Sequence, residues 1–312
     1  MRMMKAVVIR SYGGREVLDV EEVPVPGIAD DEVLVRVHAA GVNPVDWKVR
    51  AGYLKEMLPY EFPLTLGWDV SGTVAEAGSN VTGFSAGDEV YALADISRNG
   101  SYAEFIVVKA DGLALKPDSL DHVHAASVPL AALTAWQALF DAADLSGGQK
   151  ILIHAAAGGV GSFAVQLAKW KGAHVLGTAS ARNRDFLLGI GADEVIDYTT
   201  TPFEDAAADV DVVLDAMGGD TRERSWKTLK SGGILVSIVG PPDEEKAAEL
   251  GVRCAGVFVR PDAGQLSDIA ELIDKGQVKP IVTEVLPMAH VAKAHGMSET
   301  EHVRGKIVLE VE

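Results

Sequence analysis

Hydrophobic residues recur in short Val-rich runs through the first 125 or so residues, with polar positions set between them. Over residues 32–38, Val33, Val35 and Val37 alternate with Leu34, Arg36 and His38, which is the period of a half-buried strand. Clusters of Gly, Pro, Asp and Asn separate the runs, so the pattern predicts a compact barrel or distorted sandwich of short strands. The runs span residues 5–9, 32–41, 68–78, 88–93 and 102–109.

The spacing changes near residue 125. An Ala/Leu-rich helical stretch comes first, and from residue 150 strand-like and helix-like runs alternate. Alternating βαβ units predict a parallel sheet with helices on both faces, so the fold class is α/β, a Rossmann doubly wound parallel sheet plus a β-rich domain. The segment from residue 281 ends in a Val/Ile-rich strand that is predicted to return to the first domain. The predicted domains are therefore 1–125 with 281–312, and 126–280.

Composition narrows the classes of partner. The net charge of −17 disfavours nucleic acid and anionic lipid as partners. A single cysteine, Cys254, excludes an internal disulfide and any Cys-rich zinc site. The longest apolar runs are too short to span a bilayer, and the N-terminus lacks the features of a signal peptide. We therefore expect a cytoplasmic protein with no nucleic-acid and no membrane partner.

Residues 150–170 predict a phosphate-binding turn between a strand and a helix. Small residues at 155, 158 and 161 allow the sharp turn, the approach of a pyrophosphate and the packing of the helix on the sheet. The helix start supplies N–H groups and partial positive charge to the phosphates. Ala155 stands where the commonest fingerprint has its first glycine, so the motif is a variant. The predicted phosphate-binding residues are Ala157, Gly158, Gly159, Val160 and Gly161.

The second strand of this region predicts which nucleotide binds. It ends at Ser180, beside the expected adenosine ribose, where NAD-specific sites place Asp or Glu. A serine followed by Arg182 suits a 2′-phosphate instead, and Tyr198, at the end of the third strand, could add a hydroxyl. Arg184 could equally lie on a solvated helix start. The predicted cofactor is NADPH.

Several motifs together resemble the medium-chain dehydrogenase/reductase superfamily, and within it the zinc-free quinone oxidoreductase branch. They are "GVNPVDWKVRAG", "LGWDVSGTVAEAGSNVTGFSAGDEVYA", "ALTAWQAL" and "HAAAGGVGSFAVQLAK". The resemblance implies a GroES-like domain for the β-rich part, a nicotinamide in the cleft between the two domains, and a homodimer. It also implies cofactor-binding positions at Thr134 and Phe258. Ala216, Val239 and Gly240 end the fourth and fifth strands of the second domain, where the cofactor is expected to cross the sheet.

The same resemblance argues against a catalytic metal. Zinc alcohol dehydrogenases of the superfamily carry a ligand Cys at the position of Asn43 and a His-Glu pair at the positions of Trp68 and Asp69. Zinc needs three or four Cys, His or carboxylate ligands, and the pair His122 and His124 supplies only two. No metal is therefore predicted.

Without a metal, quinones and α,β-unsaturated carbonyls are the expected small-molecule electrophiles, because conjugation spreads the negative charge that hydride addition creates. The resemblance places Asn43 and Lys48 beside the nicotinamide and substrate, and Tyr53 is a candidate proton donor. Several family quinone reductases carry Tyr at the position of Lys48. The lysine could bind an enolate oxygen, contact cofactor or lie solvated on the surface, and Asp46 is expected to brace this loop.

Three alternatives remain open at the level of sequence. An enoyl reductase of lipid or polyketide metabolism uses the same chemistry. A crystallin-like protein would bind NADPH for a structural or regulatory purpose with little turnover. A zinc alcohol dehydrogenase is the third.

Overall fold

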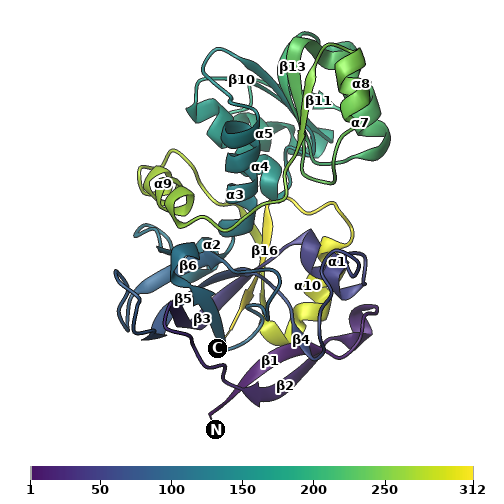
Figure 1. The fold of residues 1–312 in the computed structure, drawn as a ribbon. Coiled ribbons are helices and arrows are strands. Elements are labelled where there is room, and N and C mark those ends of the chain that lie inside the picture. The colour runs from purple at the N-terminus through teal and green to yellow at the C-terminus, as the bar shows by residue number, and fades with distance from the viewer. Residues whose placement is uncertain (1, 312) are drawn as a thin grey trace. The chain divides into compact units, whose positions relative to one another are not determined.

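The structure is a computed structural model that describes residues 2–311. Contacts within the chain divide it into two compact units. Unit 1 comprises residues 1–130, 261–276 and 280–312, and unit 2 comprises residues 131–260 and 277–279. Figure 1 shows both units, the first carrying both chain ends and the second built from the teal and green middle of the chain.

Unit 1 is built on two sheets. A three-stranded sheet has the order β2-β1-β4, and a seven-stranded sheet has the order β15-β16-β3-β5-β6-β8, with β7 paired to β3. All of these strand pairs are antiparallel except β15 with β16. The C-terminal strand β16 pairs with β3, so the end of the chain joins the N-terminal strands as predicted. The strands are β1 (Met3–Ile9), β2 (Asp19–Pro24), β3 (Glu32–Val42), β4 (Leu64–Thr65), β5 (Asp69–Ala77), β6 (Glu89–Leu93), β7 (Phe105–Lys109), β8 (Leu113–Leu115), β15 (Val282–Pro287) and β16 (Lys306–Glu310).

Among the described residues, four α-helices lie wholly within unit 1. The first, α1 (Pro44–Arg50), follows β3 directly, begins with proline at its first position and packs against α10. The other helices are α2 (His122–Ala126), α9 (Ala263–Asp274) and α10 (Val291–Ser298).

Unit 2 is a six-stranded parallel sheet of order β11-β10-β9-β12-β13-β14. In chain order this is 3-2-1-4-5-6, the doubly wound arrangement in which ligands bind at the carboxyl ends of the strands. The strands are β9 (Lys150–Ile153), β10 (His174–Ala179), β11 (Glu194–Asp197), β12 (Val210–Asp215), β13 (Leu229–Ser237) and β14 (Arg253–Gly256). The helices are α4 (Gly159–Trp170), α5 (Arg184–Gly189), α6 (Phe203–Ala206), α7 (Gly219–Ser225) and α8 (Glu244–Glu249).

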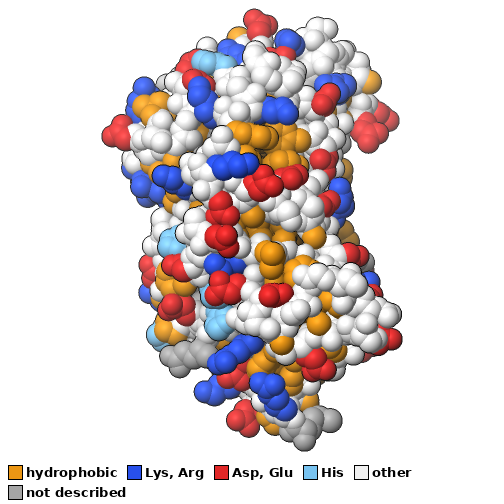
Figure 2. All heavy atoms as spheres, turned by 90° about the vertical axis from the view of Figure 1, so that its left-hand side faces the viewer, with side chains coloured by type: hydrophobic (Ala, Val, Ile, Leu, Met, Phe, Trp, Pro, Cys, Tyr) orange, Lys and Arg blue, Asp and Glu red, His pale blue; other side chains and the backbone are white. Residues whose placement is uncertain are grey.

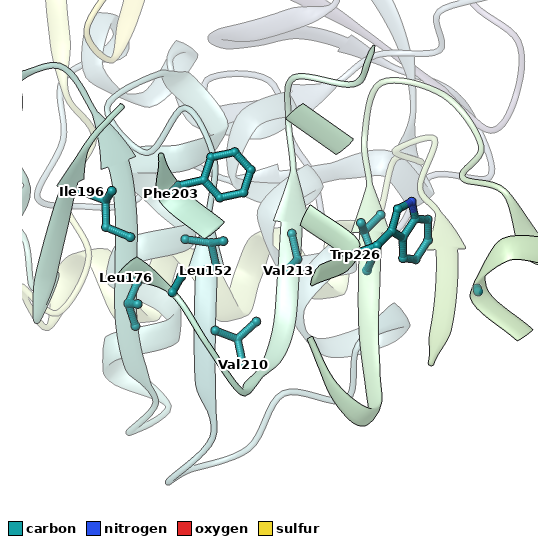
Figure 3. Close-up of a cluster of buried hydrophobic side chains, with 10 residues drawn as sticks. Leu152, Leu176, Ile196, Phe203, Val210, Val213 and Trp226 are labelled. Carbon is teal, nitrogen blue, oxygen red and sulfur yellow. The ribbon is translucent and has the colours of Figure 1, made fainter. Parts of the chain in front are cut away.

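The core of unit 2 explains the layering of this sheet. Leu152, Leu176 and Val213 project from neighbouring strands into one buried cluster, where Phe203 and Trp226 cover them (Figure 3). The region of α6 to α8 thus closes one face of the sheet, and α4 and α5 lie against the opposite face (Figure 1). This arrangement is the α/β Rossmann class that the alternating pattern predicted.

The units differ at their edges from the predicted domains. Helix α9 groups with unit 1, where the Tyr91 hydroxyl donates to the carbonyl of Leu266 at 2.6 Å. The predicted helical stretch after residue 122 is divided into α2, α3 (Pro129–Trp136) and a π-helical segment (Gln137–Ala142). Pro129 accounts for the break, because it lacks the N–H that would continue α2.

Acidic and basic side chains are interspersed over the face drawn in Figure 2. Within residues 2–311, no helix is both long and apolar enough to cross a membrane.

Candidate cofactor and active site

The turn between β9 and α4 has the geometry of a phosphate-binding loop. A Cβ at Gly161 would lie 2.3 Å from the carbonyl oxygen of Ala155 and 2.7 Å from the Cα of Ala156, so only glycine fits there. Ala155 itself has φ +50°, the left-handed region that favours glycine, which explains why other chains place glycine at this position. Helix α4 begins at Gly159, so the N–H groups of its first turn point out of the turn. Of the predicted residues, Ala157 and Gly158 belong to this turn, and Val160 lies in the first turn of α4.

The other predicted cofactor residues of unit 2 follow the carboxyl ends of the parallel strands. Because the strands are parallel, these residues share one edge of the sheet. Thr134 is the exception, since it lies buried within α3. In strand order along the chain, Ser180 follows β10, Tyr198 follows β11, Ala216 follows β12, Val239 and Gly240 follow β13, and Phe258 follows β14.

Ser180 and Tyr198 follow neighbouring strand ends. Ala179 of β10 pairs with Asp197 of β11, so the residues after them emerge side by side. Tyr198 is 55% exposed and Arg182 is exposed on the turn that follows Ser180. Arg184 instead donates to the carbonyl of Val195 at 3.1 Å. The structure thus assembles Ser180, Arg182 and Tyr198 at one corner of the sheet.

Asp197 is a carboxylate at this corner that the sequence reasoning did not weigh. It accepts the hydroxyl of Thr199 at 2.7 Å and its N–H at 3.0 Å. Hydrogen bonds from Thr199 and from the backbone N–H of Ala181 hold the pKa of Asp197 below its ordinary value. Asp197 therefore stays ionised, and its charge opposes a 2′-phosphate at the same corner. The run "EVIDY" contained the signal, because Asp197 ends the strand and Tyr198 follows it directly.

An ion pair at the ends of β12 and β13 joins the two loops that are predicted to flank the cofactor. The Arg222 guanidinium donates to Asp215 at 2.6 Å, to the Ser237 hydroxyl at 2.7 Å and to the carbonyls of Pro241 and Gly240 at 3.0 and 3.2 Å. Burial alone would raise the pKa of Asp215, but hydrogen bonds from the Gly218 backbone and Arg222 outweigh it and lower the pKa. The sequence carries no periodic signal for this pairing, which depends on the register of two parallel strands.

In unit 1, Asn43 is buried inside a polar cluster. It is 2% exposed, and its Nδ2 donates to Oδ2 of Asp69 at 2.8 Å while its Oδ1 accepts from the Lys306 ammonium. The backbone N–H of Asn43 donates to Asp46 at 2.7 Å, and the Tyr102 hydroxyl donates to the same oxygen at 2.7 Å. Asp46 thus braces the start of α1, as expected. The catalytic role of Asn43 stays a prediction.

Lys48 and Tyr53 flank one aromatic ring. The Lys48 ammonium lies 5.6 Å from the centroid of the Trp47 ring, and the Tyr53 ring stands edge-on to the same indole with centroids 5.9 Å apart. Lys48 is half-buried, and Tyr53 is 71% exposed. The structure therefore brings these two candidates together on α1 and the turn after it.

The residues present do not fit a zinc site. Trp68 is fully buried and its indole N–H donates to the carbonyl of Arg98 at 3.0 Å. Asp69 is bonded to Asn43, Lys306 and the backbone N–H of Leu130. Over the described residues, 2–311, no three His, Cys, Asp or Glu side chains are grouped so that they could hold a metal ion.

A Rossmann sheet with a glycine turn and a separate β-rich unit together define a two-unit, dinucleotide-dependent class of protein. The chain belongs to the medium-chain dehydrogenase/reductase superfamily. Residues 29–118 match the family described as alcohol dehydrogenase GroES-like domain, and residues 190–309 match that described as zinc-binding dehydrogenase.

Relatives and solved structures cover nearly the whole chain. The chain is 36% identical to the NAD(P)H oxidoreductase RTN4IP1, mitochondrial, of Danio rerio, over 99% of this chain and 92% of that protein. It is 38% identical to the NADPH-dependent alkenal/one oxidoreductase, chloroplastic, of Arabidopsis thaliana, over 98% of this chain and 79% of that protein. The quinone oxidoreductase structure from Coxiella burnetii superposes with a TM-score of 0.93 at 35% identity, covering 100% of both chains. The predicted superfamily is thereby confirmed, and a nicotinamide cofactor accords with these relatives.

Proposed function

We propose that this protein is an NADPH-dependent, zinc-independent reductase of quinones or α,β-unsaturated carbonyls. The proposal depends on two features at one edge of the Rossmann sheet. The first is the turn before α4, where Gly161 has no room for a Cβ, and the second is the corner formed by Ser180 and Arg182 after β10. The names of two relatives, the alkenal/one oxidoreductase of Arabidopsis thaliana and the quinone oxidoreductase of Coxiella burnetii, support the choice of acceptor.

The chain's own residues would act by binding and orienting. The first turn of α4 would hold the pyrophosphate with backbone N–H groups, and Ser180 with Arg182 would hold the 2′-phosphate against the opposing charge of Asp197. When bound, NADPH supplies the hydride. Lys48 would donate a hydrogen bond to the acceptor oxygen on which negative charge develops. A conjugated acceptor needs only this modest assistance, because its charge is already delocalised.

Arg182→Ala tests the choice of nucleotide. Loss of one charge-assisted hydrogen bond should lower kcat/KM for NADPH about tenfold or more and change the NADH value little. Lys227→Ala is the matched control, because Lys227 is also an exposed cation of unit 2 but lies just before β13, at the amino end of that strand. An equal effect of Arg182→Ala on both nucleotides would remove the proposed 2′-phosphate site.

The acceptor is tested with a naphthoquinone and an alkenal in the presence of NADPH, with and without a chelator. Turnover that the chelator leaves unchanged is the expected result. NADPH binding without turnover on either acceptor would favour the structural or regulatory alternative. Loss of turnover on chelation would favour a metal enzyme.

We also propose a homodimer and a cytoplasmic location. Strand β14 is an edge strand of the six-stranded sheet, and Phe258 just beyond it is 60% exposed, which supports pairing of two copies along this edge. Sedimentation of the purified protein tests the dimer. The single cysteine supports a reducing compartment.

A further inference from the structure

Unit 1 contains a buried ammonium group that the sequence analysis did not single out. Lys306, the first residue of β16, is 3% exposed, and it contacts the 2% exposed Asn43 and the fully buried Asp69. Lysines are almost never this deeply buried unless they are paired. Three polar side chains, from the N-cap of α1, from β5 and from β16, therefore meet inside the unit, at a place where an ordinary core would be apolar.

Hydrogen bonds connect all three side chains of this cluster. The Lys306 Nζ donates to Oδ1 of Asn43 and to Oδ2 of Asp69, the latter at 3.2 Å. The Asn43 amide donates to the same carboxylate oxygen at 2.8 Å, and the other oxygen accepts the Leu130 N–H at 2.6 Å. The ammonium thus fixes which way the Asn43 amide faces, because only the amide oxygen can accept from it.

Asn43 is also the residue that precedes α1. Its backbone N–H donates to Asp46, so the orientation of Asn43 and the start of α1 are connected. Lys48 lies further along this helix, and the backbone N–H of Tyr53 donates to the Lys48 carbonyl at 3.0 Å. A substitution of Lys306 can therefore alter the positions of Lys48 and Tyr53, even though Lys306 itself would not contact a substrate.

We propose that the Lys306 ammonium is the resident cation of this cluster and acts as a positioning residue for Asn43 and α1. A divalent ion would have to displace a positive charge that is already neutralised by Asp69, and it would find one carboxylate and one amide instead of a zinc ligand set. The zinc binding named in the family description "zinc-binding dehydrogenase" is thus not expected of these residues. Only the kinetic part of the following test rests on the proposed reductase function.

The test compares Lys306→Met with the double variant Lys306→Met, Asp69→Asn. The single variant leaves a buried carboxylate without its cation and should unfold at a clearly lower temperature than wild type. The double variant removes the lone charge and should regain most of that stability. In the double variant, the backbone hydrogens of residues 43–50 should still exchange about tenfold faster than in wild type. Its kcat/KM for the quinone should be about tenfold below the wild-type value, while its Kd for NADPH stays unchanged.

Lys116→Met is the matched control. Lys116 is also nearly buried in unit 1, with its side chain 6% exposed and paired with Glu89 at 3.2 Å, but it contacts neither Asn43 nor α1. It should lose stability without faster exchange over residues 43–50. Wild-type exchange over that segment in the double variant would show that Lys306 only neutralises Asp69, and would overturn the proposal. Stoichiometric Co²⁺ binding by the wild type that is lost in Asn43→Ala would overturn it as well. If the wild type fails to reduce any acceptor, the proposed function fails, while hydrogen exchange and Co²⁺ binding still decide the role of Lys306.

Discussion

Asp46 is a fully buried carboxyl group at the start of α1, and its pKa is raised to about 7 by burial. Hydrogen bonds from Tyr102 and the Asn43 backbone oppose this shift, but both reach one oxygen, and Oδ1 has no hydrogen-bond partner among residues 2–311. Because the folded pKa lies above the ordinary 3.8, folding favours the protonated form. The contribution of Asp46 to stability is thus present at low pH and is lost as the pH rises from about 4 to about 7.

Asp46→Asn should remove this pH dependence. The shift corresponds to on the order of 4 kcal/mol, so the Tm of the variant relative to wild type should rise markedly between pH 5 and pH 8. Thermal unfolding across that range measures it. Asp111→Asn serves as the control, because that residue is exposed and its substitution should shift the Tm equally at both pH values. A difference between Asp46→Asn and wild type that stays constant with pH would contradict the assigned titration.

At the scale of elements, the loops after β12 and β13 owe their shape to Arg222. Its bonds to Asp215, Ser237, Gly240 and Pro241 join the two strand ends along which the cofactor is proposed to lie. Replacing Arg222 leaves Asp215, which is fully buried, without its ion partner and lets the two loops separate.

Arg222→Met should therefore weaken NADPH binding about tenfold, since several hydrogen bonds of about 1 kcal/mol each maintain the loops. Nucleotide fluorescence measures the Kd. Arg224→Met is the control on the same helix, because Arg224 pairs with Glu204 at 2.6 Å and with Asp220 at 3.4 Å, away from the strand ends. Should both variants bind NADPH equally well, the proposed placement of the cofactor over these loops would be wrong.

The elements that could be predicted from the sequence are those with a local pattern. The six strands of unit 2 alternate with helices, and the glycine turn at 158–161 has a fixed spacing. The sheet and the turn are therefore predictable from residues that are close together in the chain. The Lys306 cluster could not be found this way. Asn43 and Lys306 are 263 residues apart, and a lysine at the start of a strand has the pattern of a solvated residue. Arg222 was missed for the same reason, because its importance depends on which strands are neighbours.

At the scale of the whole molecule, the protein has a net charge of −17 and yet is proposed to bind an anionic cofactor. A dinucleotide needs only one helix start and a few donors at short range, where local geometry outweighs the distant acidic side chains. Duplex DNA presents phosphates over a long surface and needs an extended basic face. On the face in Figure 2, basic side chains are instead mixed with acidic ones.

The protein should consequently bind NADPH and not DNA in one and the same buffer. Fluorescence anisotropy with a labelled duplex at low salt, where electrostatic attraction is strongest, is expected to show no binding at protein concentrations that saturate with NADPH. NADPH binding measured on the same sample controls for folding. DNA binding whose affinity falls with salt would mean that a basic region on another face dominates over the net charge. In that event the acidic composition would no longer argue against a nucleic-acid partner.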